Sequence, residues 1–256
     1  MAVVTDRVVL VTGVSRRAGI GAAVARLLAA EGYRLLLTGL PAYDDAQPYG
    51  GDPDGVPALT AELGDAAVHV PADLLDPAAP GALVTEAVRR YGRLDAVVAV
   101  HAYSTQTLLG ALDAAEIDRH LLVNVRATLL LAEAFDAAFT AGTGGRLVLF
   151  SSGQRLGPMP TELAYAASKA GVENLTVQLA PLLMPRGITV NCLNPGPTDT
   201  GYAPPEAHAA VAELFPGGRW GTPEDAARLV RFLCAPEAGW ITGQVIDSEG
   251  GFHRYR

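Results

Sequence analysis

Lysine is almost missing from this 256-residue chain: Lys169 is the single lysine among 19 basic residues. The 27 acidic residues outnumber the basic ones, and the formal net charge is −8. A nucleic-acid-binding surface needs clustered lysine and arginine, and no large cluster is present, so we expect no nucleic-acid partner. The chain also lacks an uncharged apolar run of about 18 residues, which argues against a membrane-spanning helix.

Cysteine and targeting signals are scarce as well. Cys192 and Cys234 are the only cysteines, too few for a disulfide scaffold and typical of a reducing compartment. The N-terminus, Met1 to Arg7, leads directly into an apolar run and lacks the layout of a signal peptide. We therefore expect a cytoplasmic protein.

Short apolar segments alternate with helical patterns along the chain. Most of these segments lack a clean polar alternation, which is typical of strands buried on both faces of a parallel sheet. They span residues 8–11, 35–38, 68–70, 94–100, 146–151, 188–193 and 244–247. The first helical pattern ends near residue 30. Four others span about 81–91, 114–141, 164–183 and 223–234. This order predicts an α/β fold with one Rossmann-type, doubly wound parallel sheet flanked by helices, a single domain over residues 1–256.

Two segments are interpreted as long loops. Residues 41–57 are rich in proline, glycine and aspartate and exceed an ordinary connection in length. Residues 201–221 carry three prolines and four glycines around a short stretch that is compatible with a helix. We expect the second segment to cover a site, the alternative being a loose surface excursion.

A glycine-rich turn, TGVSRRAGIG at 12–21, separates the first strand from the first helix. Gly13, Gly19 and Gly21 permit a tight turn and let backbone N–H groups approach a pyrophosphate at the helix N-terminus. Ser15 and Ile20 belong to the same turn and are predicted cofactor contacts. The turn therefore indicates a dinucleotide site, with a plain strand-to-helix turn as the alternative.

Charge at this site suggests which dinucleotide is bound. A carboxylate at the end of the second strand would hold the ribose hydroxyls of NAD and repel a 2′-phosphate. That strand ends in LTGL at 37–40, without an acid, whereas the turn supplies Arg16 and Arg17, which suit a phosphate. We therefore expect NADP(H) in preference to NAD(H), although Asp44 and Asp45 follow a few residues later.

Two further polar residues each have a functional and a structural interpretation. Asp73, with Leu74 beside it, follows the third strand, where it would accept a hydrogen bond from an adenine amino group or cap a turn. Asn124 lies in a mostly apolar helical segment, where a buried amide needs a hydrogen-bond partner. It is either part of a reactive site or a core amide bonded to backbone.

Tyr165 and Lys169 form the chemical centre of the sequence. Residues four apart on a helix share a face, with their Cβ atoms about 5–6 Å apart. A neighbouring ammonium stabilises phenolate, so we expect a lowered pKa for Tyr165 and a general acid/base role. Ser152, after the strand at 146–151, is placed to hydrogen-bond a substrate oxygen as charge develops on it. No set of metal ligands is predicted.

Taken together, these residues resemble the short-chain dehydrogenase/reductase family over essentially the whole chain. The family pattern is a glycine-rich turn, an asparagine, a serine, Tyr-x-x-x-Lys and a Pro-Gly turn, and it is matched here in order. Ser152 lies thirteen residues before Tyr165, as in many members, and the Pro-Gly turn is NPGPTDT at 194–200.

The resemblance implies hydride transfer between a nicotinamide and a substrate carbonyl carbon. Tyr165 would supply the proton, and Ser152 would polarise the carbonyl. Lys169 would bind the nicotinamide ribose and lower the pKa of the tyrosine. Asn124 would hold a water that links Lys169 to solvent.

The resemblance also assigns the late turn and the assembly. Pro195 and Gly196 would help to hold the nicotinamide carboxamide, with Thr198 or Thr200 as the hydroxyl donor. A homotetramer or homodimer would form through the helices at 114–141 and 164–183.

Two features depart from the family pattern. Five residues, rather than three, separate Gly13 from Gly19, which leaves open which arginine meets a 2′-phosphate. The segment Asn-Asn-Ala-Gly that usually ends the fourth strand is replaced by AVHA at 99–102. His101 either substitutes for that segment or, as we expect, is a satisfied polar residue at a strand end.

The substrate class is inferred from charge. The sequence looks closest to members labelled 3-oxoacyl-carrier-protein reductases, which dock an acidic carrier on basic helix faces. Arg186 is suitably placed, but the segment between Arg126 and Arg146 contains Glu133 and Asp136 and no basic residue. A protein of net charge −8 would repel an acidic partner.

We therefore expect a carrier-independent carbonyl reductase in a biosynthetic pathway. A 3-oxoacyl-carrier-protein reductase is the first alternative, and a non-catalytic dinucleotide sensor is the second. The substrate pocket would be lined by residues 103–106, by residues 154–163 and by the region of Tyr202.

Overall fold

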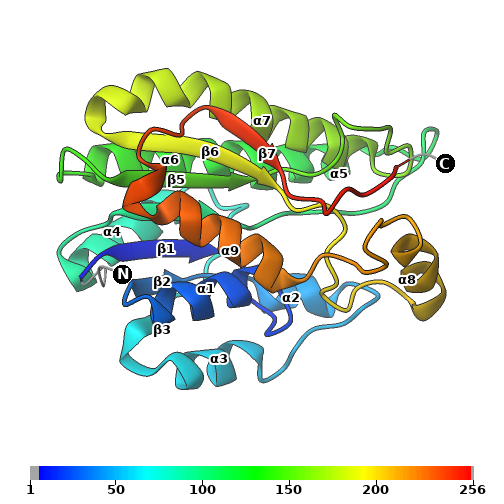
Figure 1. Ribbon diagram of the computed structural model, residues 1–256, viewed down its shortest axis with the longest axis horizontal. Coiled ribbons are helices and arrows are strands. Elements are labelled where there is room, and N and C mark those ends of the chain that lie inside the picture. Colours follow the sequence, from blue (N-terminus) through cyan, green and yellow to red (C-terminus); the bar gives the residue numbers. More distant parts are fainter. Residues whose placement is uncertain (1–5, 255–256) are drawn as a thin grey trace.

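Seven parallel strands form one sheet in the order β3-β2-β1-β4-β5-β6-β7 in the computed structural model, which describes residues 6–254 (Figure 1). The strands are β1 (Val8–Thr12), β2 (Arg34–Leu37), β3 (Ala67–His69), β4 (Ala96–Ala99), β5 (Gly145–Phe150), β6 (Ile188–Asn194) and β7 (Gln244–Asp247). The order reverses between β1 and β4, which pair in register from Val9–Ala96 to Thr12–Ala99. In such sheets, ligands bind beyond the carboxyl ends of the strands at this reversal.

Helices cover both faces of the sheet. One apolar core packs α4 (Ala79–Tyr91), α6 (Ala127–Ala138) and α7 (Leu163–Leu183) against the strands. The other core contains α1 (Ile20–Ala30), α3 (Gly55–Leu63) and α9 (Pro223–Cys234). The remaining helices are α2 (Pro41–Asp45), α5 (Ala114–His120), α8 (Pro205–Ala212) and short 3-10 turns at Gly64–Ala66, Met184–Arg186 and Pro236–Ala238. The expected Rossmann-type fold is confirmed, with strand bounds close to those predicted.

The helical segment expected at 114–141 is not one regular helix. A π-helical turn, Leu121–Arg126, separates α5 from α6 and contains the buried Asn124. A π turn shifts the backbone hydrogen-bond pattern by one residue and is often found at functional sites. Hydrophobic periodicity did not reveal it, because one extra residue per turn scarcely changes the apolar pattern.

The interpretation of residues 41–57 as a loop is wrong at both of its ends. Pro41 begins α2, consistent with the preference of proline for the first turn of a helix, and α3 begins at Gly55. In the other long segment, α8 lies at the edge where the strands end (Figure 1). Trp220 anchors that segment: its ring stacks on His208 at 4.8 Å, and its Nε1–H donates to the His208 carbonyl.

No helix within residues 6–254 is long and apolar enough to cross a membrane.

Candidate active site

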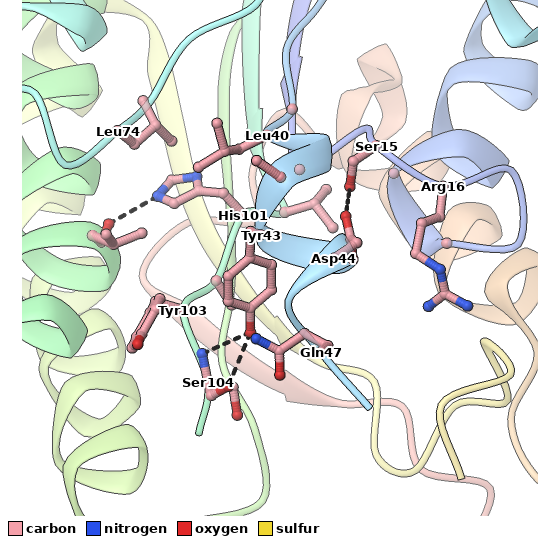
Figure 2. Close-up of a pocket in the computed structure, with 18 of the residues that line it drawn as sticks. Ser15, Arg16, Leu40, Tyr43, Asp44, Gln47, Leu74, His101, Tyr103 and Ser104 are labelled. Atoms are coloured by element: carbon pink, nitrogen blue, oxygen red, sulfur yellow. Dashed lines mark hydrogen bonds between the residues drawn. The ribbon is translucent and has the colours of Figure 1, made fainter. Parts of the chain in front are cut away.

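A cavity of about 590 Å³ opens at the carboxyl ends of β1, β2 and β4 (Figure 2). Its lining comes from the segments 13–21, 38–49, 72–75 and 100–104, together with Arg119, Val123 and Thr200. This is the crevice at the strand-order reversal, where the sequence placed the dinucleotide.

The glycine-rich turn forms one wall of this cavity. Gly13 has φ +71°, and a Cβ there would lie 2.7 Å from the backbone N of His101. A Cβ on Gly21 would lie 2.5 Å from the Gly13 carbonyl, so both positions need glycine. Gly19 begins α1 without a side-chain cap, and the first turn of α1 has no acid. The free N–H groups of that helix end fit the pyrophosphate of a dinucleotide.

The two arginines of the turn have different surroundings. Arg16 lines the cavity, lies over the Tyr49 ring at 4.5 Å and donates to the Thr200 carbonyl at 3.1 Å. Arg17, in the same segment, does not line the cavity, and its guanidinium donates two hydrogen bonds, of 2.7 and 2.8 Å, to Asp52. Of the two expected phosphate ligands, only Arg16 is thus placed to meet a ligand in the cavity.

Helix α2 contributes side chains that the sequence analysis did not single out as cavity residues. The buried Asp44 accepts a hydrogen bond from Ser15, as Figure 2 shows, and burial raises the pKa of its carboxyl. The Tyr43 hydroxyl donates to the Ser104 carbonyl at 2.9 Å and accepts from the Ser104 N–H at 3.1 Å. The tyrosines and acidic residues within 41–57 were the signal in the sequence that could have identified these cavity residues. The direction in which their side chains point depends on α2, which was not predicted.

Asp73 and Leu74, for which adenine contacts are predicted, also line the cavity. One oxygen of Asp73 accepts from the Leu75 N–H at 2.8 Å, which is the alternative turn-capping role. The Asp73 side chain is exposed, and its second oxygen remains available to accept a hydrogen bond from an adenine amino group. The two roles are therefore compatible.

The tertiary fold brings Ser152, Tyr165 and Lys169 together beside β5. Lys169 is 3% exposed, and its Nζ donates to the Phe150 carbonyl at 2.9 Å. The same Nζ lies 5.7 Å from the centre of the Tyr165 ring. Ser152 lies close enough to Tyr165 to lower the pKa of the phenol.

The expected net lowering of the Tyr165 pKa is not found. Burial raises the pKa of Tyr165, because it disfavours the phenolate more than Ser152 favours it. Burial also lowers the pKa of Lys169 to about 8. Sequence spacing could not show this, since it reports proximity but not desolvation.

Asn124 is a fully engaged buried amide. Its Oδ1 accepts from the Tyr103 N–H at 2.7 Å, and its Nδ2 donates to the Tyr103 carbonyl and the Ser168 hydroxyl. Ser168 in turn donates to the Tyr165 carbonyl at 2.7 Å. Asn124 thereby links the loop after β4 to the helix of Tyr165. A water held by Asn124 would have to bind to its oxygens, because both amide hydrogens are donated.

His101 is a satisfied polar residue at the end of β4. Its Nε2 faces the Val123 carbonyl at 3.2 Å, so Nε2 carries the hydrogen and Nδ1 accepts from the Thr12 hydroxyl at 2.7 Å. Burial lowers the pKa of His101 to about 3, and the neighbouring Lys169 adds to this effect. The neutral imidazole therefore joins the ends of β1 and β4 to the π turn.

The Pro-Gly turn is held in shape by Asn194, to which the sequence analysis gave no role. Asn194 is fully buried, and its Oδ1 accepts from the Gly196 N–H at 3.0 Å. Its Nδ2 donates to Asp247 and Glu249. Pro195 begins this turn, Thr198 lies buried within it, and Thr200 reaches the cavity. These positions agree with, but do not test, the predicted carboxamide contacts.

The sheet order, the uncapped glycine-rich helix start and the Ser-Tyr-Lys group define the class of a dinucleotide-dependent oxidoreductase. A family model described as enoyl-(acyl carrier protein) reductase matches residues 13–253. The chain belongs to the short-chain dehydrogenase/reductase family.

Two similar proteins match this chain over almost its whole length. An uncharacterized oxidoreductase, YjdA, of Bacillus subtilis is 37% identical over 97% of this chain and 98% of that protein. A 3-oxoacyl-[acyl-carrier-protein] reductase of Synechocystis is 29% identical over 98% of both proteins.

Solved structures agree with the fold. A dehydrogenase/reductase from Sinorhizobium meliloti matches with a TM-score of 0.86 and 33% identity, over 97% of this chain and 95% of that chain. A short-chain dehydrogenase/reductase from Serratia marcescens matches with a TM-score of 0.85 and 30% identity, over 97% and 99%.

Proposed function

We propose that this enzyme interconverts a ketone and a secondary alcohol, with a nicotinamide dinucleotide as its redox partner, and acts on free carbonyl compounds in a biosynthetic pathway. The observation that carries the proposal is the position of Tyr165 next to the buried Lys169, with Ser152 acting on the same phenol. A phenol, a hydroxyl and an ammonium in this arrangement suit proton transfer to a carbonyl oxygen.

The bound nicotinamide would supply or accept the hydride. In the reductive direction, Tyr165 gives its phenolic proton to the substrate oxygen, while the Ser152 hydroxyl donates a hydrogen bond to that oxygen. Lys169 is mostly protonated at neutral pH, because its pKa of about 8 lies above it. Its charge stabilises the phenolate that remains, which offsets part of the cost of burial.

Proton resupply is assigned to Asn124. Its Oδ1 accepts one hydrogen bond, from the Tyr103 N–H, and the second lone pair of that oxygen would hold a water that relays protons to Lys169.

NADP(H) is proposed as the preferred cofactor. The support is the guanidinium of Arg16 at the cavity wall and the absence of an acid at 37–40, where β2 ends. Asp44 is the opposing charge in the cavity, and Ser15 and Tyr49 hydrogen-bond its carboxylate. An arginine fork binds a 2′-phosphate better than it binds a hydroxyl.

Charge on the helix surface supports a substrate that is free of a carrier protein. Arg186, the basic residue best placed for an acidic carrier, forms an ion pair with Asp136 and donates to the carbonyls of Asp136 and Phe139. A committed arginine offers little attraction to a second acidic surface.

A homotetramer or homodimer is proposed from the apolar side chains on two helical segments. Leu121 and Leu129 on the first, with Val177 and Leu182 on the second, are 41–69% exposed. Exposed apolar patches of this kind mark contact surfaces. Both cysteines are unpaired, which supports a reducing, cytoplasmic location.

The experiment is oxidation of NADPH, with NADH in parallel, on a panel of free ketones and on a β-ketoacyl thioester without carrier protein. Turnover of free ketones supports the proposal. Turnover of the thioester alone would favour the carrier-protein alternative. Absence of turnover on every carbonyl, with cofactor bound, would favour the dinucleotide sensor.

A further inference from the structure

Tyr43 joins two segments that follow strands on opposite sides of β1. Tyr43 lies in α2, which follows β2, and Ser104 lies in the loop after β4. Because β2 and β4 both pair with β1, they are two strand spacings, or about 10 Å, apart. A contact between these two segments therefore has to cross the end of β1, where the glycine-rich turn begins.

One side chain makes this contact. The Tyr43 hydroxyl donates to the Ser104 carbonyl at 2.9 Å and accepts from the Ser104 N–H at 3.1 Å, as Figure 2 shows. The Tyr43 ring also lies against the ring of Tyr103, with the ring centres 5.5 Å apart. All three residues line the cavity of about 590 Å³. Tyr43 is thus part of the cavity wall and connects its two sides.

The loop after β4 is the fixed side of this contact. The backbone N–H and carbonyl of Tyr103 are both hydrogen-bonded to the Asn124 side chain. The Tyr103 hydroxyl donates to Glu116 at 2.9 Å, and its ring lies against His120 with the centres 4.8 Å apart. The loop is therefore anchored to α5 and to the π turn, and movement that breaks the Tyr43 contact is expected on the side of α2.

Helix α2 is held by polar contacts instead of by core packing. Neither apolar core contains a residue from 40–54, all of which the structure describes, and Asp44 is the one buried residue of α2. The Asp44 carboxylate accepts from the hydroxyls of Ser15 and Tyr49. Local opening costs least where few apolar side chains are buried. Helix α2 can therefore move away from Ser104 without exposing either core.

We propose that α2 is a strap across the dinucleotide cavity, that the Tyr43–Ser104 contact is its latch, and that the latch opens each time a nicotinamide dinucleotide enters or leaves. This inference rests on the proposed binding of the dinucleotide in this cavity. It goes beyond the proposed reaction, because it concerns the exchange of the cofactor. Passage occurs only in the open state, so the rates of entry and of exit both scale with the population of that state.

Tyr43→Phe tests the latch, because it removes both hydrogen bonds and keeps the ring. Stopped-flow fluorescence follows binding of NADPH and of NADH, and their displacement by the oxidised dinucleotides, so the test does not depend on which cofactor is preferred. We expect the association and dissociation rate constants both to rise about fivefold or more, with a smaller change in Kd. A simple ligand contact would instead raise the dissociation rate constant alone and weaken binding.

Hydrogen exchange at the Ser104 amide is a second measurement, and it needs no cofactor. The Tyr43 hydroxyl protects this N–H, so its exchange, followed by NMR, should be about fivefold or more faster in Tyr43→Phe. The neighbouring Tyr103 amide, which donates to Asn124, should exchange at the same rate in both proteins.

Tyr91→Phe is the matched control. It removes a hydroxyl that donates to the Leu35 carbonyl at 3.1 Å, and Tyr91 does not line the cavity. This variant should leave both rate constants unchanged.

The outcomes separate the strap from the proposed reaction. Unchanged rate constants in Tyr43→Phe, or a rise in the dissociation rate constant alone, would overturn the strap and leave the reaction standing. Faster entry and exit without turnover of any ketone would contradict the reaction alone. Failure of the wild-type protein to bind either dinucleotide would overturn both.

Discussion

Arg16 and Arg17 are adjacent in the sequence, but they face different partners. Arg16 reaches the cavity wall and the Thr200 carbonyl, whereas Arg17 forms a two-point contact with Asp52 outside the cavity. Their side chains diverge because the turn between β1 and α1 directs successive residues away from each other. The pair therefore offers a built-in control for the cofactor preference.

Arg16→Ala should lower the ratio of kcat/KM for NADPH to that for NADH by about tenfold or more, because a charge-assisted contact to the 2′-phosphate is lost. Arg17→Ala should leave the ratio unchanged. Asp44→Asn should raise the ratio, since it removes the negative charge beside Ser15. Steady-state kinetics with both cofactors tests this, and equal effects of the two arginine variants would contradict it.

Tyr165→Phe should reduce kcat by about 10²–10⁴-fold, the usual contribution of a general acid/base, while cofactor affinity stays the same. Cofactor binding is followed by fluorescence titration. Tyr33→Phe is the control, because Tyr33 directly precedes β2, at the amino ends of the strands, where its hydroxyl donates to the Cys234 carbonyl. Retention of wild-type turnover in Tyr165→Phe would refute the assignment.

Lys169 should make the stability of the folded state rise with pH between about 8 and 10.5. In that window the unfolded chain still binds a proton at Lys169 that the folded chain has released, so higher pH favours the folded state. Below about pH 8 both states hold the proton and this contribution is constant. Relative to Lys169→Met, the wild-type free energy of unfolding should gain about 3 kcal/mol across the window.

The comparison of the two proteins cancels groups that titrate independently of Lys169, whereas the Cys192 thiol, whose pKa burial raises to about 12, interacts with Lys169 and contributes to the difference. Urea unfolding at a series of pH values measures it. A constant difference between the two proteins across the window would show that Lys169 stays protonated when folded.

Gly39→Ala should destabilise the protein by about 1–3 kcal/mol and weaken cofactor binding. The added Cβ would overlap the Val14 carbonyl, which belongs to the glycine-rich turn, so the backbone must move. Gly81→Ala in α4 meets open space and should instead stabilise the protein by about 0.5–1 kcal/mol. Thermal unfolding of both variants measures these effects. A neutral Gly39→Ala would show that the glycine-rich turn does not pack against Gly39 as described.

The strands and most helices were predictable because their signals are local. Apolar runs of strand length and the four-residue spacing of Tyr165 and Lys169 depend only on neighbours in the sequence. The π turn around Asn124 and the short helix α2 escaped prediction, since neither changes the apolar periodicity enough to be seen.

The class of fold, the glycine-rich turn and the helical spacing of Tyr165 and Lys169 followed from the sequence alone. Tertiary structure decided which arginine reaches the cavity, and that burial raises rather than lowers the pKa of Tyr165. The physical reason is that hydration and charge pairing depend on groups far apart in the chain. Only folding brings those groups together and removes the water between them.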